Sequence, residues 1–107
     1  MEVHFTTTEG ITLITVQGRI DTITAGDFET KVTQLTDGSC NIILDCSQMD
    51  YISSSGLRVF LVLQKRIKAV GGVLKICSLQ PSIKEIFDIS GFSTIFSIFT
   101  DQASAKS

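Results

Sequence analysis

The chain has 107 residues, the size of one ordinary domain, and 43% of them are hydrophobic while 19% are charged. This composition supplies enough apolar material for a core and excludes a disordered chain. The net charge of −2, without any block of basic residues, argues against nucleic-acid binding through phosphate contacts.

Membrane and secretory classes are not expected either. No apolar stretch approaches the roughly 18 residues of a membrane span, so no membrane insertion is predicted. The first ten residues, MEVHFTTTEG, lack the basic start and apolar run of a signal peptide. The three cysteines, Cys40, Cys46 and Cys77, form no CxxC or Cys/His cluster, which disfavours a zinc site or a disulfide framework. A cytoplasmic protein with reduced thiols, and without a metal or cofactor, is the simplest interpretation.

In the first third of the chain, residues 3–7 and 11–18 have strand-like patterns, and Glu9-Gly10 between them predicts a hairpin turn. Residues 18–21 are expected to form a loop. A helix follows, with Thr24 as its N-cap and Asp27 completing a near capping box. Its buried stripe is predicted to contain Phe28, Val32 and Leu35, and Asp37-Gly38 is predicted to end it.

The middle of the chain predicts a buried parallel strand over 41–46, the longest helix over 56–70 and a strand over 73–77. The first half of that helix is apolar nearly all round, whereas its second half is expected to have a solvated face formed by Gln64, Lys65, Arg66 and Lys68. Gly71-Gly72 is predicted to terminate it.

The last third begins with a helix whose first residue is Pro81, a position where the missing N–H costs nothing. Its expected buried stripe contains Ile83, Ile86 and Phe87, and its expected end is a left-handed Gly91 with Phe92 over the last turn. A strand over 94–99 and a short helix capped by Asp101 and running through Ala105 complete the prediction.

Strands that alternate with helices after an initial hairpin predict an α/β fold in a single domain over 1–107. Its sheet should be mixed and mostly parallel, with about five strands, and about four helices should pack on it.

Three serines stand at the mouth of the longest helix, in the stretch DYISSSGLRVFL over 50–61. In such folds, ligands and partners meet the carboxyl ends of the strands, where the helices begin. A phosphate on Ser54 would find free N–H groups and a partial positive charge there. Gly56 has no Cβ, so another backbone can approach closely. The alternative interpretation is that the serines are ordinary helix caps.

The stretch LDCSQMDYISSSGLRVFL resembles the core of the STAS domains, and in particular the free-standing bacterial anti-sigma factor antagonists. GRIDTITAGDF and VGGVLKICSLQPSIKEIFDISGFSTIFSIFTD resemble other segments of the same family, so that the resemblance extends from about Phe5 to Ala103. It implies a STAS-like fold and a protein that binds an anti-sigma factor serine kinase and thereby frees the sigma factor. It also implies that this kinase phosphorylates the antagonist to end the interaction, and that a serine phosphatase resets it.

The resemblance places the phosphorylated serine two residues before the glycine, at Ser54. Many family members have an aspartate where this chain has Ser53, which leaves Ser53 and Ser55 as alternative acceptors. The partner-binding residues implied are Asp21, Ser53, Ser55, Gly56 and Arg58.

Several of these residues have a second interpretation from their chemistry alone. Asp21 either places the hydroxyl or satisfies backbone N–H groups of its loop, and Arg58 either contacts a partner's carboxylate or is a solvated arginine. Asp45 is expected to bond the region of Ser47, and the single histidine, His4, is expected to lie away from the serines. No enzyme motif is present in the sequence. The alternative functions are an accessory STAS subunit of a lipid-transport or stress-signalling assembly, or a nucleotide-binding STAS module.

Overall fold

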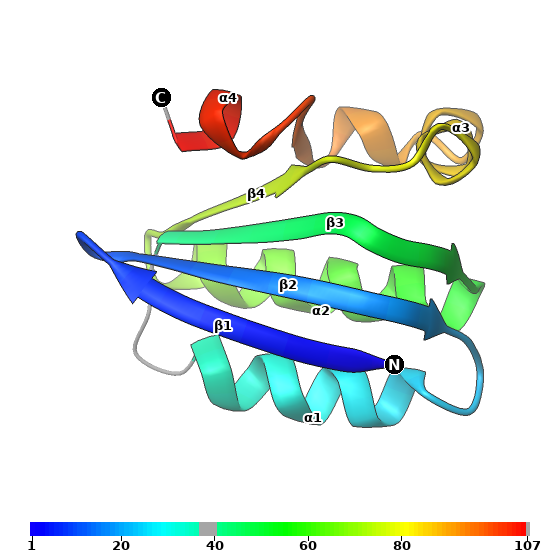
Figure 1. Ribbon diagram of the computed structural model, residues 1–107, viewed down its shortest axis with the longest axis horizontal. Coiled ribbons are helices and arrows are strands. Elements are labelled where there is room, and N and C mark those ends of the chain that lie inside the picture. The colour runs from blue at the N-terminus through cyan, green and yellow to red at the C-terminus, as the bar shows by residue number, and fades with distance from the viewer. Residues whose placement is uncertain (37–40, 107) are drawn as a thin grey trace.

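The computed structural model describes residues 1–36 and 41–106 and contains one five-stranded sheet in the order β1-β2-β3-β4-β5 (Figure 1). β1 is antiparallel to β2, and every other neighbouring pair is parallel. The strands are β1 (Glu2–Thr8), β2 (Ile11–Ile20), β3 (Asn41–Ile52), β4 (Val73–Cys77) and β5 (Ser97–Phe99). The helices are α1 (Ala25–Thr36), α2 (Ser54–Ala69), α3 (Pro81–Ile89) and α4 (Gln102–Lys106), with a 3-10 helix η1 (Phe92–Thr94). The mixed, mostly parallel sheet with helices packed on it is confirmed.

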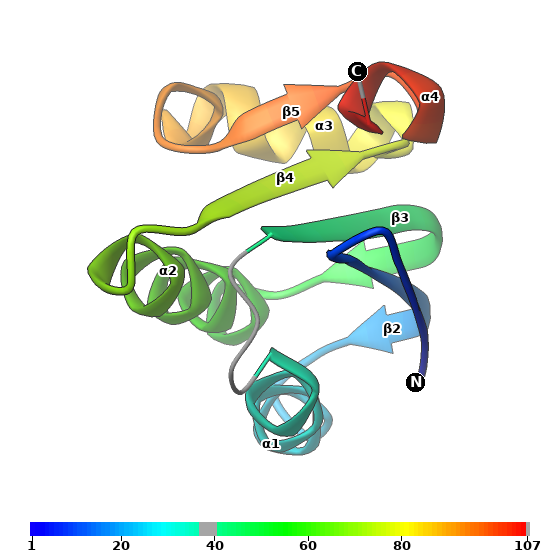
Figure 2. The same cartoon turned by 90° about the vertical axis from the view of Figure 1, so that its left-hand side faces the viewer.

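The main core lies between the sheet and the larger helices, and it is rich in aromatic rings. The ring of Phe60 in α2 lies 5.6 Å from that of Phe28 in α1, 6.0 Å from Phe87 in α3 and 6.3 Å from Phe96. α4 lies across the sheet from α1 and α2 (Figure 2), and its Ala105 packs on Ile43. The sheet is therefore covered on both faces, which explains the near-continuous apolar run of β3.

β3 is longer than the sequence predicts. The prediction ended it too early because the alternation of buried and exposed residues along β3 is interrupted twice. The expected end at Cys46 is wrong, since the strand continues to Ile52. Two shifts in its register with β2 each insert one extra residue on the β3 side. The residues Cys46, Met49 and Ile52, each three apart, therefore all face the main core. Bulges of this kind break the period of two that identifies a strand in a sequence.

Two other boundaries differ from the prediction. The loop expected over 18–21 is wrong, because β2 continues to Ile20 in parallel pairing with β3. The last strand is only three residues long, because the N–H groups of Ile95 and Phe96 bond back to the carbonyl of Phe92 in a helical turn. Local hydrogen bonding thus replaces the first half of the expected strand.

Side-chain burial also corrects two assignments. Gln64 was expected on the solvated face of α2, but it is only 7% exposed and donates its amide N–H to the carbonyl of Ile95 at 3.0 Å. Ile86, expected in the buried stripe of α3, is 37% exposed, whereas Ile83 and Phe87 are buried as predicted. The burial of Gln64 depends on where the segment after α3 lies, which helical periodicity does not reveal.

Most local signals are confirmed. Glu9 and Gly10 form the hairpin turn with positive φ angles of 53° and 79°, and Gly91 has the expected left-handed backbone at 82°. Asp101 accepts the N–H of Ser104 at 2.8 Å and so caps α4. The capping box is wrong in its contacts, because Asp27 pairs with Lys31 at 3.1 Å instead.

Two predictions fall outside the described residues, namely the helix stop at Asp37-Gly38 and the thiol of Cys40. Within the described ranges, none of the helices combines the length and the apolar character that a membrane crossing needs.

The aromatic cluster yields a stability prediction. Phe60→Ala should lower the free energy of unfolding by about 3–5 kcal/mol, because it removes a fully buried ring that three other rings contact. Val62→Ala, at an exposed position of the same helix, is the matched control and should change it by less than about 1 kcal/mol. Urea unfolding followed by circular dichroism measures both. Equal losses for the two variants would contradict the position assigned to this core.

Candidate functional site

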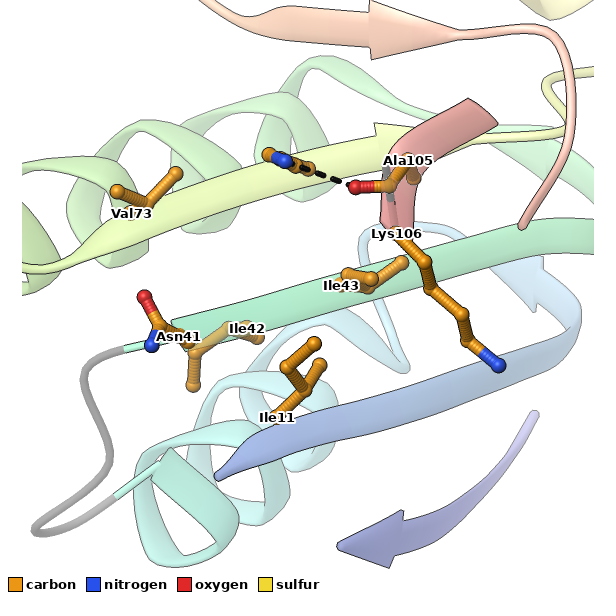
Figure 3. A pocket seen from close by; sticks show the side chains of 8 residues that line it. Ile11, Asn41, Ile42, Ile43, Val73, Ala105 and Lys106 are labelled. Carbon is orange, nitrogen blue, oxygen red and sulfur yellow. Dashed lines mark hydrogen bonds between the residues drawn. The ribbon is translucent and has the colours of Figure 1, made fainter. Parts of the chain in front are cut away.

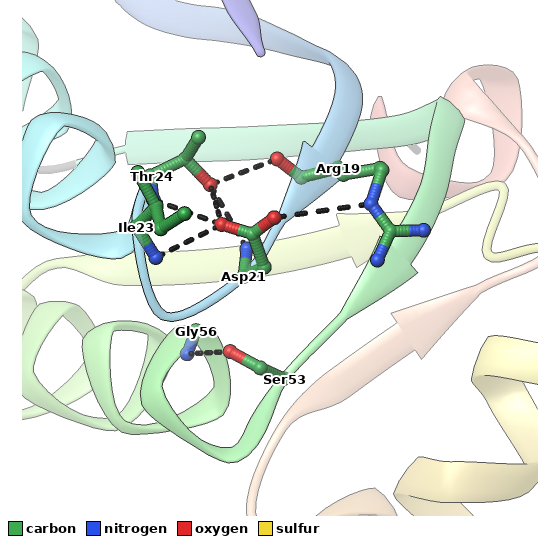
Figure 4. A network of polar contacts seen from close by, with 6 residues as sticks. All are labelled: Arg19, Asp21, Ile23, Thr24, Ser53 and Gly56. Atoms are coloured by element: carbon green, nitrogen blue, oxygen red, sulfur yellow. Dashed lines mark hydrogen bonds and ion pairs between the residues drawn. The ribbon is translucent and has the colours of Figure 1, made fainter.

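A single residue, Ser53, joins β3 to α2, so the predicted gap between a strand ending at Cys46 and a helix beginning at Gly56 is wrong. The N–H of Ser53 donates to the carbonyl of Ile20 at 2.8 Å, which ties the ends of β2 and β3 together. Its hydroxyl oxygen accepts the N–H of Gly56 at 3.2 Å, as an N-cap does (Figure 4). Ser53 therefore has the cap role that the sequence left open among three serines.

Ser54 is the first residue of α2 and is exposed, whereas Ser55 is half-buried. The Ser54 hydroxyl makes no hydrogen bond to any other residue that the structure describes. Arg58 is exposed and follows Ser54 by four residues, so both side chains lie on one face of the helix. A phosphate on Ser54 would therefore lie at the positive end of the helix and next to an arginine.

At Gly56 the first turn of α2 packs closely on the ends of β2 and β3. A Cβ at this position would lie 2.7 Å from Cγ2 of Ile20 and 2.8 Å from Cγ1 of Ile52, both well inside van der Waals contact. The atoms that approach Gly56 are thus side chains of this chain, which differs from the partner backbone that the sequence suggested. The glycine allows the first turn of α2 to rest directly on the ends of β2 and β3.

Asp21 organises the loop between β2 and α1, next to the serines. Its Oδ1 accepts the N–H groups of Ile23 at 2.9 Å and Thr24 at 3.0 Å, and its own N–H donates to the Thr24 hydroxyl (Figure 4). The hydrogen bond from the Thr24 N–H is the main reason that the pKa of Asp21 lies below its usual value. Partial burial opposes this effect, and the Ile23 N–H, the Thr24 hydroxyl and Arg19 reinforce it.

Arg19 and Tyr51 lie near the carboxyl ends of β2 and β3, close to the serines, and the sequence analysis did not identify them as site residues. They are direct neighbours in the register of β2 and β3. The guanidinium carbon of Arg19 lies 4.3 Å from the centre of the Tyr51 ring, and its Nε lies 3.8 Å from Oδ2 of Asp21. The sequence analysis placed Arg19 in a loop over 18–21, whereas the structure places it in β2.

Asp45 and His4 lie elsewhere. Asp45 is buried in β3, where it accepts the N–H of Ser47 at 2.9 Å, as expected, and a hydrogen bond from the side chain of Gln102 in α4. Burial raises the pKa of Asp45, but these hydrogen bonds outweigh it, so the pKa lies below its usual value. His4 is exposed on β1, with Nε2 3.5 Å from the carboxylate of Glu2.

A hollow of about 150 Å³ lies on the face that α4 covers (Figure 3). Its lining includes Ile11, Ile43, Val73, Ala105 and Lys106, and none of the predicted site residues. Ligand pockets usually occupy about 300–1,000 Å³, so this hollow is small for a nucleotide. The nucleotide-binding alternative stays a prediction.

The STAS domain family model matches residues 2–105, so the chain belongs to the STAS domain family. BtrV of Bordetella bronchiseptica, named as an anti-sigma factor antagonist, is 36% identical over 98 residues, which cover 91% of this chain and 84% of the relative. A crystal structure from Thermotoga maritima, described as an anti-sigma factor antagonist, has a TM-score of 0.92 at 18% identity and covers 97% of this chain and 91% of its own.

A third similar structure is the Bacillus cell fate determinant SpoIIAA in its phosphorylated form. It has a TM-score of 0.73 at 18% identity, and the match covers 97% of this chain and 96% of that one. At this identity, the two solved structures support the fold alone.

The cap role of Ser53 is testable with two substitutions. Ser53→Ala should lower the free energy of unfolding by about 1 kcal/mol, because the Gly56 N–H loses its acceptor. Ser53→Asp should restore that stability, since aspartate caps as well as serine does. Thermal and urea unfolding measure both variants. If Ser53→Ala were as stable as the wild type, the hydrogen bond to Gly56 would not act as a cap.

The close approach at Gly56 predicts a second effect on stability. Gly56→Ala should destabilise the fold by about 1–3 kcal/mol, because the new methyl group overlaps Ile20 and Ile52. Gly26→Ala is the matched control, since Gly26 is also helical and a Cβ there meets nothing within 4 Å. This control should be neutral or stabilising by up to about 1 kcal/mol. A ranking of the two variants in the opposite order, measured by urea unfolding, would refute the close contact.

Proposed function

We propose that this chain is an anti-sigma factor antagonist that binds an anti-sigma factor serine kinase and is switched off by phosphorylation of Ser54. Binding to the kinase releases the sigma factor, and a serine phosphatase resets the antagonist. The observation that carries the proposal is the exposed hydroxyl of Ser54 at the first position of α2. The name of the relative from Bordetella bronchiseptica supports the same class of function.

The surroundings of Ser54 separate the effect of a phosphate on folding from its effect on binding. A phosphate adds a charge of about −1.5 to −2 at neutral pH. At a helix start this charge stabilises by about 0.3–1 kcal/mol, and the nearby Arg58 adds to the attraction, so the fold tolerates it. In a desolvated interface, an unpaired charge costs about 3–5 kcal/mol. Phosphorylation would therefore weaken binding on the order of a hundredfold or more, and leave the fold intact.

The residues around Ser54 have different roles in the proposed site. Ser53 caps the helix in place of an aspartate, and Gly56 lets the helix start rest on the strands, so Ser54 is held in one fixed position. Asp21 fixes the adjoining loop. Ser55 and Arg58 complete the surface that the kinase would contact.

The phosphorylation prediction is tested with ATP and the purified anti-sigma factor kinase of the same organism. The wild-type chain should gain the mass of one phosphate, located on Ser54 by tandem mass spectrometry, and Ser54→Ala should gain none. Ser54→Asp should bind the kinase at least about tenfold more weakly, because its carboxylate is desolvated in the interface.

The matched control is Ser82→Ala, which changes another exposed serine in the first turn of a helix, α3. It should be phosphorylated and bind like the wild type. Modification of Ser54→Ala at the wild-type rate would contradict the assignment, and a phosphate on Ser53 or Ser55 would move it to that residue.

A further inference from the structure

Arg19 is held in place although its side chain is 61% exposed. One face of its guanidinium stacks on the ring of Tyr51, with 4.3 Å between the guanidinium carbon and the ring centre. Its Nε lies 3.8 Å from the Asp21 carboxylate (Figure 4). An arginine that is stacked on an aromatic ring and paired through Nε loses much of its rotational freedom before any partner arrives.

The carboxylate of Asp21 does not depend on this arginine. Its Oδ1 already accepts the N–H groups of Ile23 and Thr24, as well as the Thr24 hydroxyl at 3.2 Å. The contact with Arg19 is long and involves one nitrogen only, and an exposed pair of this kind contributes little to stability. The interaction thus orients Arg19 more than it stabilises the loop.

The terminal nitrogens of the guanidinium remain available. Apart from the two contacts described, the Arg19 side chain makes no hydrogen bond or ion pair with any residue that the structure describes. These nitrogens form the fork that binds a carboxylate through two parallel hydrogen bonds. A lysine in the same place would offer only a point charge.

Arg19 also lies beside the proposed switch. Ile20, the next residue, bonds through its carbonyl to the N–H of Ser53 and contacts the helix start at Gly56. Tyr51 precedes Ser53 by two residues. The backbone next to Arg19 is thus joined to Ser53, the residue before Ser54, so a partner that covers Ser54 and the strand ends around it can also reach Arg19.

We infer that Arg19, stacked on Tyr51 and oriented by Asp21, is a specificity-determining residue that binds a carboxylate side chain of the partner kinase. This inference rests on the proposed function. Arginine and tyrosine are the residue types most often found at the energetic centre of protein interfaces. An arginine oriented in advance gains affinity, because little conformational freedom is lost on binding.

The test uses the full chain and the purified anti-sigma factor kinase, with binding measured by calorimetry and by association kinetics at low and at physiological salt. Arg19→Ala should weaken binding about tenfold or more. Arg19→Lys should recover only part of that loss, because it keeps the charge but not the fork. Arg19→Glu should also slow association, most strongly at low salt.

Two further variants test whether a loss of binding comes from the orientation of Arg19 or from a change in the stability of the fold or in the overall charge. Asp21→Asn keeps an oxygen for the loop N–H groups but removes the charge that faces Arg19, so it should weaken binding while its thermal unfolding stays near that of the wild type. Lys68→Ala removes an exposed cation in the last turn of α2 and is the control that should leave binding unchanged.

The inference is overturned if Arg19→Ala binds within about twofold of the wild type while Ser54→Asp binds weakly. In that case the proposed switch at Ser54 would be supported, but Arg19 would have no part in binding the kinase. It is equally overturned if Lys68→Ala loses as much affinity as Arg19→Ala, because the effect would then be one of general charge. If the wild-type chain binds no anti-sigma factor kinase, the proposed function fails, and the inference fails with it.

Discussion

The contact of Gly56 with Ile20 and Ile52 is the constraint on which the site depends. It brings the first turn of α2 down onto the carboxyl ends of β2 and β3, where no side chain larger than hydrogen fits. The same approach allows the carbonyl of Ile20 to accept the N–H of Ser53, so that strand, cap and helix start form one rigid corner. The helix start with its serines is held by this corner.

In the proposed switch, this corner separates the residues that stabilise the fold from the residue that is modified. The cap at Ser53 and the packing at Gly56 are internal contacts of the fold, whereas Ser54 points outward between them and contributes little to it. Under the proposed function, a charge added to Ser54 would therefore change what the surface can bind without unfolding the domain. The cap role of Ser53 is one that an aspartate could also fill, because both residues cap a helix through the same hydrogen bond.

The polar groups beside the corner are arranged around Asp21. One oxygen of its carboxylate fixes the loop that leads into α1, and the other faces Arg19 across 3.8 Å. Asp21 thus fixes the loop between β2 and α1 and also orients the exposed side chain of Arg19. The pKa of Asp21 lies below its usual value, so the carboxylate stays ionised at neutral pH, and the arrangement does not depend on small changes of pH.

The sequence by itself determined the order of the elements, the mixed sheet and the helix-start position of the serines, because these follow from short-range periodicity, glycines and caps. It did not determine which serine is the cap, because that depends on hydrogen-bond geometry over three residues. It also missed the length of β3, since two bulges disrupt the alternation, and the burial of Gln64, since that depends on a segment 31 residues away. Arg19 and Tyr51 meet only because parallel pairing places β2 beside β3. Contacts between distant strands are set by tertiary structure, and no local pattern encodes them.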